Sequence, residues 1–173
     1  MNVWEELRKT DPEFADFFRN FAFDEVVNED DLDEHTRMMA ILAALLGCQG
    51  KEIYEEMLPA ALRAGVTPVE IKEIVYQATA YLGIGRVYPF FRITNQVLEA
   101  EKVALPLEEQ GTTGIEDRVE KGEQAQVDIF GEGMKGFAAS GPEESRHINR
   151  WLCGNWFGDY YSRTGRKCQQ REM

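Results

Sequence analysis

Cysteine and histidine are scarce in this chain, and the few cysteines are far apart. Among 173 residues there are three cysteines and two histidines. The cysteines are Cys48, Cys153 and Cys168, and none forms a C-x-x-C pair. Their number and spacing exclude a disulfide framework of the kind found in small secreted proteins. We therefore expect a protein of the reducing cytoplasm.

Long apolar runs are also missing. The longest, MMAILAALLG at residues 38–47, is too short to cross a bilayer as a helix. The first residues, MNVWEELRKTDPEF, lack the basic start and apolar run of a signal peptide. These absences predict a protein without membrane segments.

Positive charge is in short supply, with 19 Lys and Arg against 31 Asp and Glu, and a net charge of −12. Phosphates of nucleic acids and anionic lipids would be repelled, so we expect neither as a partner. A small-molecule ligand stays open. The acidic stretch at 24–34 lacks the glycine and ligand spacing of an EF-hand, so we interpret it as a solvated loop. The residues indicate no metal and no cofactor.

Helical periodicity covers most of what remains, and no convincing strand is present. Apolar spacing, proline and glycine positions predict helices over residues 12–23, 33–47, 51–65, 68–82, 86–102, 115–131 and 143–162. Pro59 should kink the third of these or split it in two. Residues 38–47 are apolar nearly all round, which predicts a helix buried on most sides. The fold class is therefore all-α.

The clearest local signal is TPVE at residues 67–70. Thr67 is an N-cap, Pro68 suits the first helical position, and Glu70 closes a capping box. Gly65 before it should end the preceding helix in a left-handed conformation. This stretch predicts a sharp turn between two helices.

The chain divides by composition into residues 1–102, a polar linker at 103–114, and residues 115–173. The last part repeats the pattern of the first when Arg171 is placed on Arg37 and Met173 on Met39. Both copies then show an aromatic helix, a short polar connection, an arginine and an apolar residue. We interpret the chain as one complete helical unit followed by the opening of a second, as in a shortened two-repeat protein.

The motifs TRMMAILAALLG and LPAALRAGVTPVEIKEIVYQATAYLGIG resemble the carboxymuconolactone decarboxylase family, which includes the AhpD-like alkylhydroperoxidases. The resemblance covers residues 32–98. EKGEQAQVDIFGEG also resembles the E-x-G helix that precedes the core in the decarboxylase branch. The family implies an AhpD-like helical bundle that assembles as a homo-oligomer, a trimer or hexamer, with active sites between helices and subunits.

The redox branch of that family uses a Glu-x11-Cys-x2-Cys-x3-His relay, in which a thiolate attacks and carboxylate and imidazole move protons. A gapless alignment from Thr36 to Gly65 places these positions at Met38, Gly50, Ile53 and Met57. None of the relay residues is retained. Met57 also stands where the decarboxylase branch has a helix histidine.

Four other residues are candidates for chemistry: Cys48, Glu56, Arg37 and Arg86. Cys48 lies two residues before the first relay cysteine, at a helix C-terminus where the dipole disfavours a thiolate. It is either a small semi-buried residue or the thiol of a one-cysteine site. Glu55 and Glu56 face different directions, so one of them should face solvent, and the other is a possible acid or base at a subunit interface, with Glu56 as the candidate. Arg37 and Arg86 are either carboxylate ligands or ordinary surface arginines.

Two functions of different classes follow. One is an enzyme that acts on a small carboxylate or lactone, or, using Cys48, a peroxidase. The other is a non-catalytic or weakly active helical oligomer that has lost the thiol relay, and the missing relay residues favour it. A fast reaction of Cys48 with peroxide or an alkylating probe at neutral pH would favour the redox enzyme.

Overall fold

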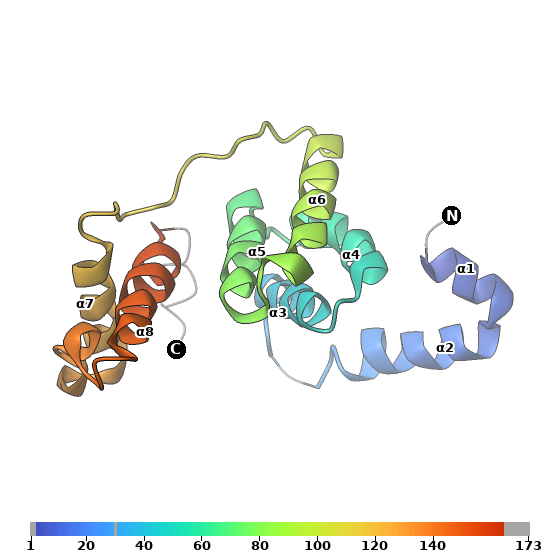
Figure 1. The fold of residues 1–173 in the computed structure, drawn as a ribbon. Coiled ribbons are helices and arrows are strands. Elements are labelled where there is room, and N and C mark those ends of the chain that lie inside the picture. Colours follow the sequence, from blue (N-terminus) through green and yellow to red (C-terminus); the bar gives the residue numbers. More distant parts are fainter. Residues whose placement is uncertain (1–2, 30, 165–173) are drawn as a thin grey trace. The chain divides into compact units, whose positions relative to one another are not determined.

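A computed structural model describes residues 3–29 and 31–164, and within these ranges it contains helices and no strand (Figure 1). The prediction of an all-α protein is therefore confirmed. The Arg171 and Met173 positions used to align the two copies lie outside the described residues, as does Cys168. The half-repeat stays a prediction.

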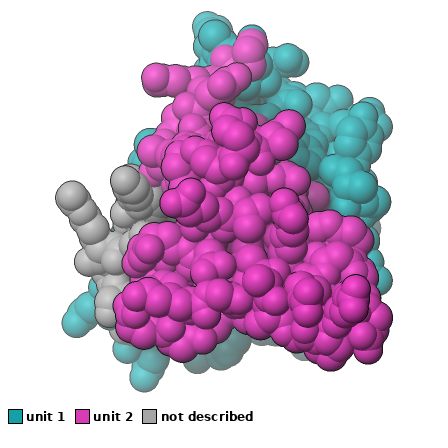
Figure 2. All heavy atoms as spheres, turned by 60° about the vertical axis from the view of Figure 1, so that its left-hand side comes forward, with its two compact units in different colours: residues 1–75, 84–105 teal, residues 76–83, 106–173 magenta. Residues whose placement is uncertain are grey.

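The chain forms two compact units, which are coloured separately in Figure 2. Unit 1 comprises residues 1–75 and 84–105, and unit 2 comprises residues 76–83 and 106–173. Helix α5 (Pro68–Leu82) contributes its first half to unit 1 and its second half to unit 2.

Unit 1 begins with a small aromatic cluster. Helix α1 (Val3–Thr10) packs against α2 (Pro12–Asn20), which continues into the π-helical turn η1 (Phe21–Glu25). The ring of Trp4 stacks on that of Phe18 at a centroid distance of 5.6 Å. Helix α1 was not among the predicted helices. Pro12 occupies the first turn of α2, and the Asp11 side chain before it makes no capping bond.

The core of unit 1 lies among α3 (Glu34–Gly47), α4 (Lys51–Arg63), α6 (Ile84–Ala100) and the start of α5. Fully buried side chains from these helices fill it, including Leu42, Leu46, Tyr54, Leu58, Ile71, Phe90 and Leu98. The Tyr54 hydroxyl, which would be costly to bury alone, pairs with the Thr94 hydroxyl at 3.0 Å. Burial raises the pKa of Tyr54 to about 12.

Two predictions about these helices need correction. Helix α4 is one uninterrupted helix with Pro59 inside it, so the expected split does not occur, and the alternative of a kink stays a prediction. Helix α3 is buried on one side only: Met38, Met39, Leu42 and Leu46 are buried, while small residues on its other side, Ala40, Ala43, Ala44 and Gly47, are exposed.

The turn before α5 is as predicted. Gly65 has φ = +90°, and the amide of Val66 donates to the Ala61 carbonyl at 3.0 Å, which closes the end of α4. The capping box is present in both directions, because the Glu70 amide donates to Thr67 Oγ1 at 3.2 Å and the Thr67 amide donates to Glu70 Oε2 at 2.8 Å.

Unit 2 contains α7 (Arg118–Phe130), the 3-10 turns η2 (Glu132–Met134) and η3 (Phe137–Ala139), helix α8 (Arg146–Trp151) and the π-helix η4 (Leu152–Tyr161). The predicted loop at 132–142 thus contains two short 3-10 turns. The predicted final helix exists but widens into π geometry after Trp151.

Glycine allows α7 and η4 to approach closely. A Cβ on Gly122 would collide with the Cys153 carbonyl oxygen and lie 2.7 Å from the Gly158 nitrogen. Beside this crossing, Arg118 Nη1 donates to Asp159 Oδ2 at 2.8 Å, and the buried Cys153 thiol donates to Gln126 Oε1 at 3.1 Å. The aromatic C-terminal segment therefore approaches the α7 backbone closely, and side-chain contacts such as Phe130 with Phe157, at a centroid distance of 5.9 Å, add to this packing.

Candidate functional site

The aligned relay positions lie on α3 and α4 and carry no group that transfers protons or attacks a substrate. Met38 is buried on α3, and Gly50 occupies the N-cap position of α4. Ile53 and Met57 lie one turn apart on α4, and both are half-buried. Apolar side chains and a glycine therefore occupy this part of the α3–α4 pair.

Cys48 is exposed, which corrects the expectation of a semi-buried side chain. It is the C-cap residue of α3, as the sequence predicted. Its thiol donates weakly to the Leu45 carbonyl, with an Sγ–O distance of 3.5 Å. The C-terminal end of a helix does not offer the positive charge that is typical of reactive-cysteine sites.

The other three candidates, Arg37, Glu56 and Arg86, lie in different parts of unit 1. The Arg37 guanidinium donates to the Val27 carbonyl at 3.0 Å, in the segment that precedes α3. Glu56 is half-buried and accepts a bond from the Val3 amide at 3.4 Å, while its neighbour Glu55 is exposed, as expected. Arg86 is exposed in the first turn of α6.

These contacts do not form one site. Arg37 and Cys48 stand at opposite ends of α3, about 16 Å apart along the helix axis, since each residue of an α-helix adds about 1.5 Å. Glu56 is engaged at the start of α1. The structure therefore gives no support to a site in which Arg37 and Cys48 act on one small substrate.

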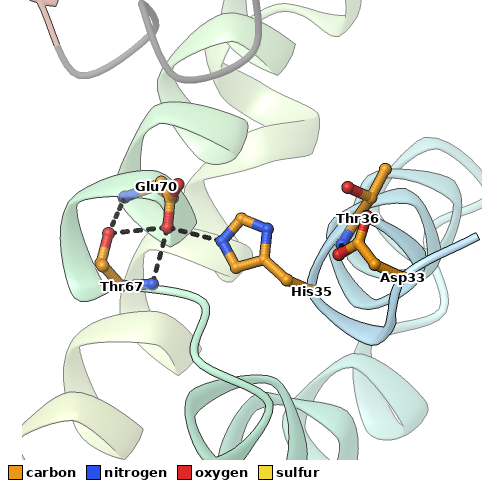
Figure 3. Close-up of polar contacts among 5 residues, drawn as sticks. All are labelled: Asp33, His35, Thr36, Thr67 and Glu70. Atoms are coloured by element: carbon orange, nitrogen blue, oxygen red, sulfur yellow. Dashed lines mark hydrogen bonds and ion pairs between the residues drawn. The ribbon is translucent and has the colours of Figure 1, made fainter. Parts of the chain in front are cut away.

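The structure does assemble a polar cluster that the sequence did not reveal. His35, in the first turn of α3, places Nε2 3.1 Å from Oε2 of Glu70 (Figure 3). The same carboxylate oxygen accepts bonds from the amide and the hydroxyl of Thr67, each at 2.8 Å. The His35 side chain is 34% exposed and that of Glu70 only 8%. A buried capping carboxylate thus orients a partly exposed imidazole.

The groups around Glu70 determine which atom of the His35–Glu70 pair carries the proton. Burial acts to raise the pKa of Glu70, but the hydrogen bonds from Thr67 and His35 outweigh it, and the pKa is lowered from its ordinary 4.5. Glu70 is therefore ionised at neutral pH and accepts hydrogen bonds only. It follows that Nε2 of His35 carries the proton in the pair, and Nδ1 of a neutral ring is left as an acceptor.

The local sequence pattern around His35 gave no sign of its partner. Glu70 is recognisable as a capping residue, but 35 positions separate it from His35. Only the packing of α3 beside the start of α5 brings the two together.

A second charged group is buried on α5. Lys72 is 9% exposed, and its ammonium donates to the Asn95 side-chain oxygen on α6. Burial lowers the pKa of Lys72. Glu73 beside it is 3% exposed. The apolar residues Ile71, Ile74 and Val75 are buried as well, so this whole stretch of α5 is covered.

The described residues hold no metal centre and no membrane span. Within residues 3–29 and 31–164, no group of three or more His, Cys, Asp or Glu side chains is placed to bind a metal ion. In the same part of the chain, every helix is too short or too polar to cross a membrane.

Over residues 3–29 and 31–164, these observations define an all-helical protein. Comparison with known proteins shows what this chain is similar to. Residues 12–96 match the model of the carboxymuconolactone decarboxylase family. The chain is 31% identical over 80 residues to a 4-carboxymuconolactone decarboxylase of Acinetobacter baylyi.

That alignment covers 46% of this chain and 60% of the Acinetobacter protein, so the chain spans only part of its curated relative. No solved structure gives a significant match. The resemblance seen in the helix motifs is confirmed.

Proposed function

We propose that this protein is a non-redox member of its family, a cytoplasmic helical oligomer that does not carry out thiol–peroxide chemistry. The observation that supports it is the content of the four relay positions, which hold Met38, Gly50, Ile53 and Met57. Thiol-dependent peroxide reduction needs a thiolate nucleophile and groups that move protons to and from it. None of these side chains supplies either function.

The environment of Cys48 supports the same proposal. A reactive cysteine is favoured by a helix N-terminus or a nearby cation, which stabilise the thiolate. Cys48 instead caps the C-terminus of α3, and its thiol contact is with a backbone carbonyl. A peroxidase that uses this residue as its nucleophile is therefore the less favoured reading.

Self-association is proposed from the exposed side of α3. Ala40, Ala43, Ala44 and Gly47 recur at helical spacing and are exposed. Side chains this small let another helix approach closely, and they leave an apolar surface open in a single chain. We propose a trimer or hexamer in which this surface is covered by a second copy.

A second function is favoured by one observation, the His35–Glu70 pair. A carboxylate-oriented imidazole with Nδ1 as an acceptor is suited to general base catalysis. The relative's name specifies 4-carboxymuconolactone as its substrate. On this alternative, the protein acts on a small carboxylate or lactone, with His35 moving a proton.

One set of assays separates these readings. The proposal predicts that reduction of an alkyl hydroperoxide with dithiothreitol proceeds at the same rate with wild-type protein and with Cys48→Ser. A rate that is lost in Cys48→Ser but kept in Cys153→Ser would overturn it. Release of carbon dioxide from 4-carboxymuconolactone that is lost in His35→Gln would establish the second function instead.

A further inference from the structure

A cavity of about 480 Å³, half open to solvent, lies among the first helices of unit 1. Its walls come from α1, α2 and η1, and the lining residues are Trp4, Glu5, Arg8, Ala15, Arg19 and Phe23. Its volume falls within the range of about 300–1,000 Å³ that is typical of small-molecule sites. None of the candidate residues chosen from the sequence lines it.

Aromatic rings give the cavity a fixed apolar wall. Trp4 meets Phe23 edge to face at a centroid distance of 5.8 Å, and its other neighbour, Phe18, stacks on it at 5.6 Å. Rings held by two aromatic contacts keep their orientation without a ligand. Ala15 has a small side chain and leaves room between the helices. A flat apolar molecule therefore has both space and a preformed surface.

Two guanidinium groups give the cavity a charge preference. Arg8 comes from α1, one turn after Trp4, and Arg19 comes from α2, one turn after Ala15. Arg19 makes one long contact, 3.5 Å to the Asn20 side-chain oxygen, and both arginine side chains are exposed. With Glu5 as the acidic lining residue, the cavity carries one net positive charge.

We propose that this cavity binds an aromatic monocarboxylate, with Arg8 and Arg19 holding the carboxylate and the Trp4–Phe23 wall contacting the ring. A guanidinium binds a carboxylate through two parallel hydrogen bonds, which suits a planar anion. Glu5 opposes a doubly charged ligand such as a phosphate monoester, because the net charge of the lining balances only one negative charge. The apolar wall favours a carboxylate attached to a ring.

The family match does not supply the whole site, since it includes Ala15, Arg19 and Phe23 but not the residues from α1. Trp4, Glu5 and Arg8 precede residue 12, where the match begins. The proposal also does not depend on the function proposed above, since neither the relay positions nor His35 contribute to the cavity.

The test is a titration of the ¹⁵N-labelled full chain with 2-naphthoate, followed by the indole N–H signals of its three tryptophans. Trp4→Phe assigns the Trp4 signal. We expect that signal to shift to saturation while those of Trp151 and Trp156 stay in place. The neutral isostere 2-naphthalenemethanol should bind at least about tenfold more weakly, because a charge-assisted hydrogen bond is lost.

Variants separate charge from shape. Arg8→Gln and Arg19→Gln should each weaken 2-naphthoate binding at least about tenfold, whereas Arg92→Gln, an exposed arginine on α6, should not change it. Ala15→Leu should abolish binding by filling the cavity, with the helical circular dichroism retained. The proposal is overturned by an absent or unsaturable Trp4 shift, by equal affinity for the neutral alcohol, or by wild-type affinity in both arginine variants.

Discussion

Nε2 of His35 lies 3.1 Å from Oε2 of Glu70, so the first turn of α3 is tied to the capping carboxylate of α5. The same oxygen accepts both Thr67 bonds of the capping box. One carboxylate therefore closes the α4–α5 turn and positions the imidazole of His35, which lies 35 residues earlier in the chain, in the first turn of α3. Loss of the Glu70 charge should therefore destabilise both the start of α3 and the start of α5.

The first prediction concerns stability in acid. Because the pKa of Glu70 is lower in the folded protein than its ordinary 4.5, the folded state binds this proton less readily than the unfolded state. The stability from the Glu70 charge is therefore complete above pH 4.5 and is lost as pH falls through the lowered folded pKa. Glu70→Gln should lower the free energy of unfolding by about 0.5–2 kcal/mol at pH 7 and by less at pH 3.

Urea unfolding followed by circular dichroism at the two pH values measures this difference. Glu55→Gln, an exposed carboxylate on α4, is the matched control and should change little at either pH. An equal loss of stability for Glu70→Gln at pH 7 and pH 3 would contradict this prediction, because it would show that the negative charge of Glu70 does not contribute to the free energy of unfolding.

The second prediction concerns thiol reactivity. Burial raises the pKa of Cys153 to about 11, with a smaller contribution from the charge of Glu123, and its thiol is bonded to Gln126. Cys48 is exposed. Iodoacetamide at pH 7.5 should label Cys48 at the rate of an ordinary exposed thiol and leave Cys153 unlabelled until the protein is unfolded. Peptide mass spectrometry gives the two rates separately, and Cys48 labelling far faster than that of glutathione would revive a redox role.

Local signals in the sequence were enough for most of the helices. Pro68, Thr67 and Glu70 specify the start of α5 by themselves, and Gly65 ends α4, because each acts through the backbone within four residues. Pro59 does not split α4, because tertiary packing can override the low helix propensity of proline. The exposed side of α3 was not predicted, because alanine and glycine count as apolar in a periodicity pattern whether they are buried or exposed.

The polar cluster and the cavity were not predictable in the same way. His35 and Glu70 are distant in sequence, and neither residue's neighbours indicate the other. The cavity needs α1, which has no strong capping signal, and it depends on how α1 turns back against α2. Contacts of this kind arise from packing between elements, so they become visible only in three dimensions.

The third prediction tests the close crossing of α7 and η4. A methyl group on Gly122 has no room, because it would collide with the backbone of Cys153 and crowd that of Gly158. Gly122→Ala should therefore destabilise unit 2 by about 1–3 kcal/mol, although alanine favours a helix over glycine by about 1 kcal/mol. Gly133→Ala, in the same unit with nothing within 4 Å of the added methyl, should be close to neutral.

Thermal unfolding of the two variants tests this prediction through both the sign and the size of the change in melting temperature. If intrinsic helix preference governed, Gly122→Ala would raise the melting temperature. A rise, or a fall no larger than that of Gly133→Ala, would mean that α7 and η4 are not held as closely as the structure shows.

The last prediction addresses self-association through α3. Ala44 is exposed on the small-residue side of the helix, in its last turn, where a cation is compatible with the helix dipole. Ala44→Lys should therefore leave the fold of one chain intact, yet it would place an unpaired charge in the proposed interface, where desolvation is costly. Light scattering should show an oligomer for the wild type and a shift of Ala44→Lys toward the 19.8 kDa monomer.

The control is Ala100→Lys, at the exposed end of α6, which should leave the oligomer unchanged. A wild-type monomer at micromolar concentration would remove the proposed assembly, and an intact Ala44→Lys oligomer would move the interface away from this side of α3.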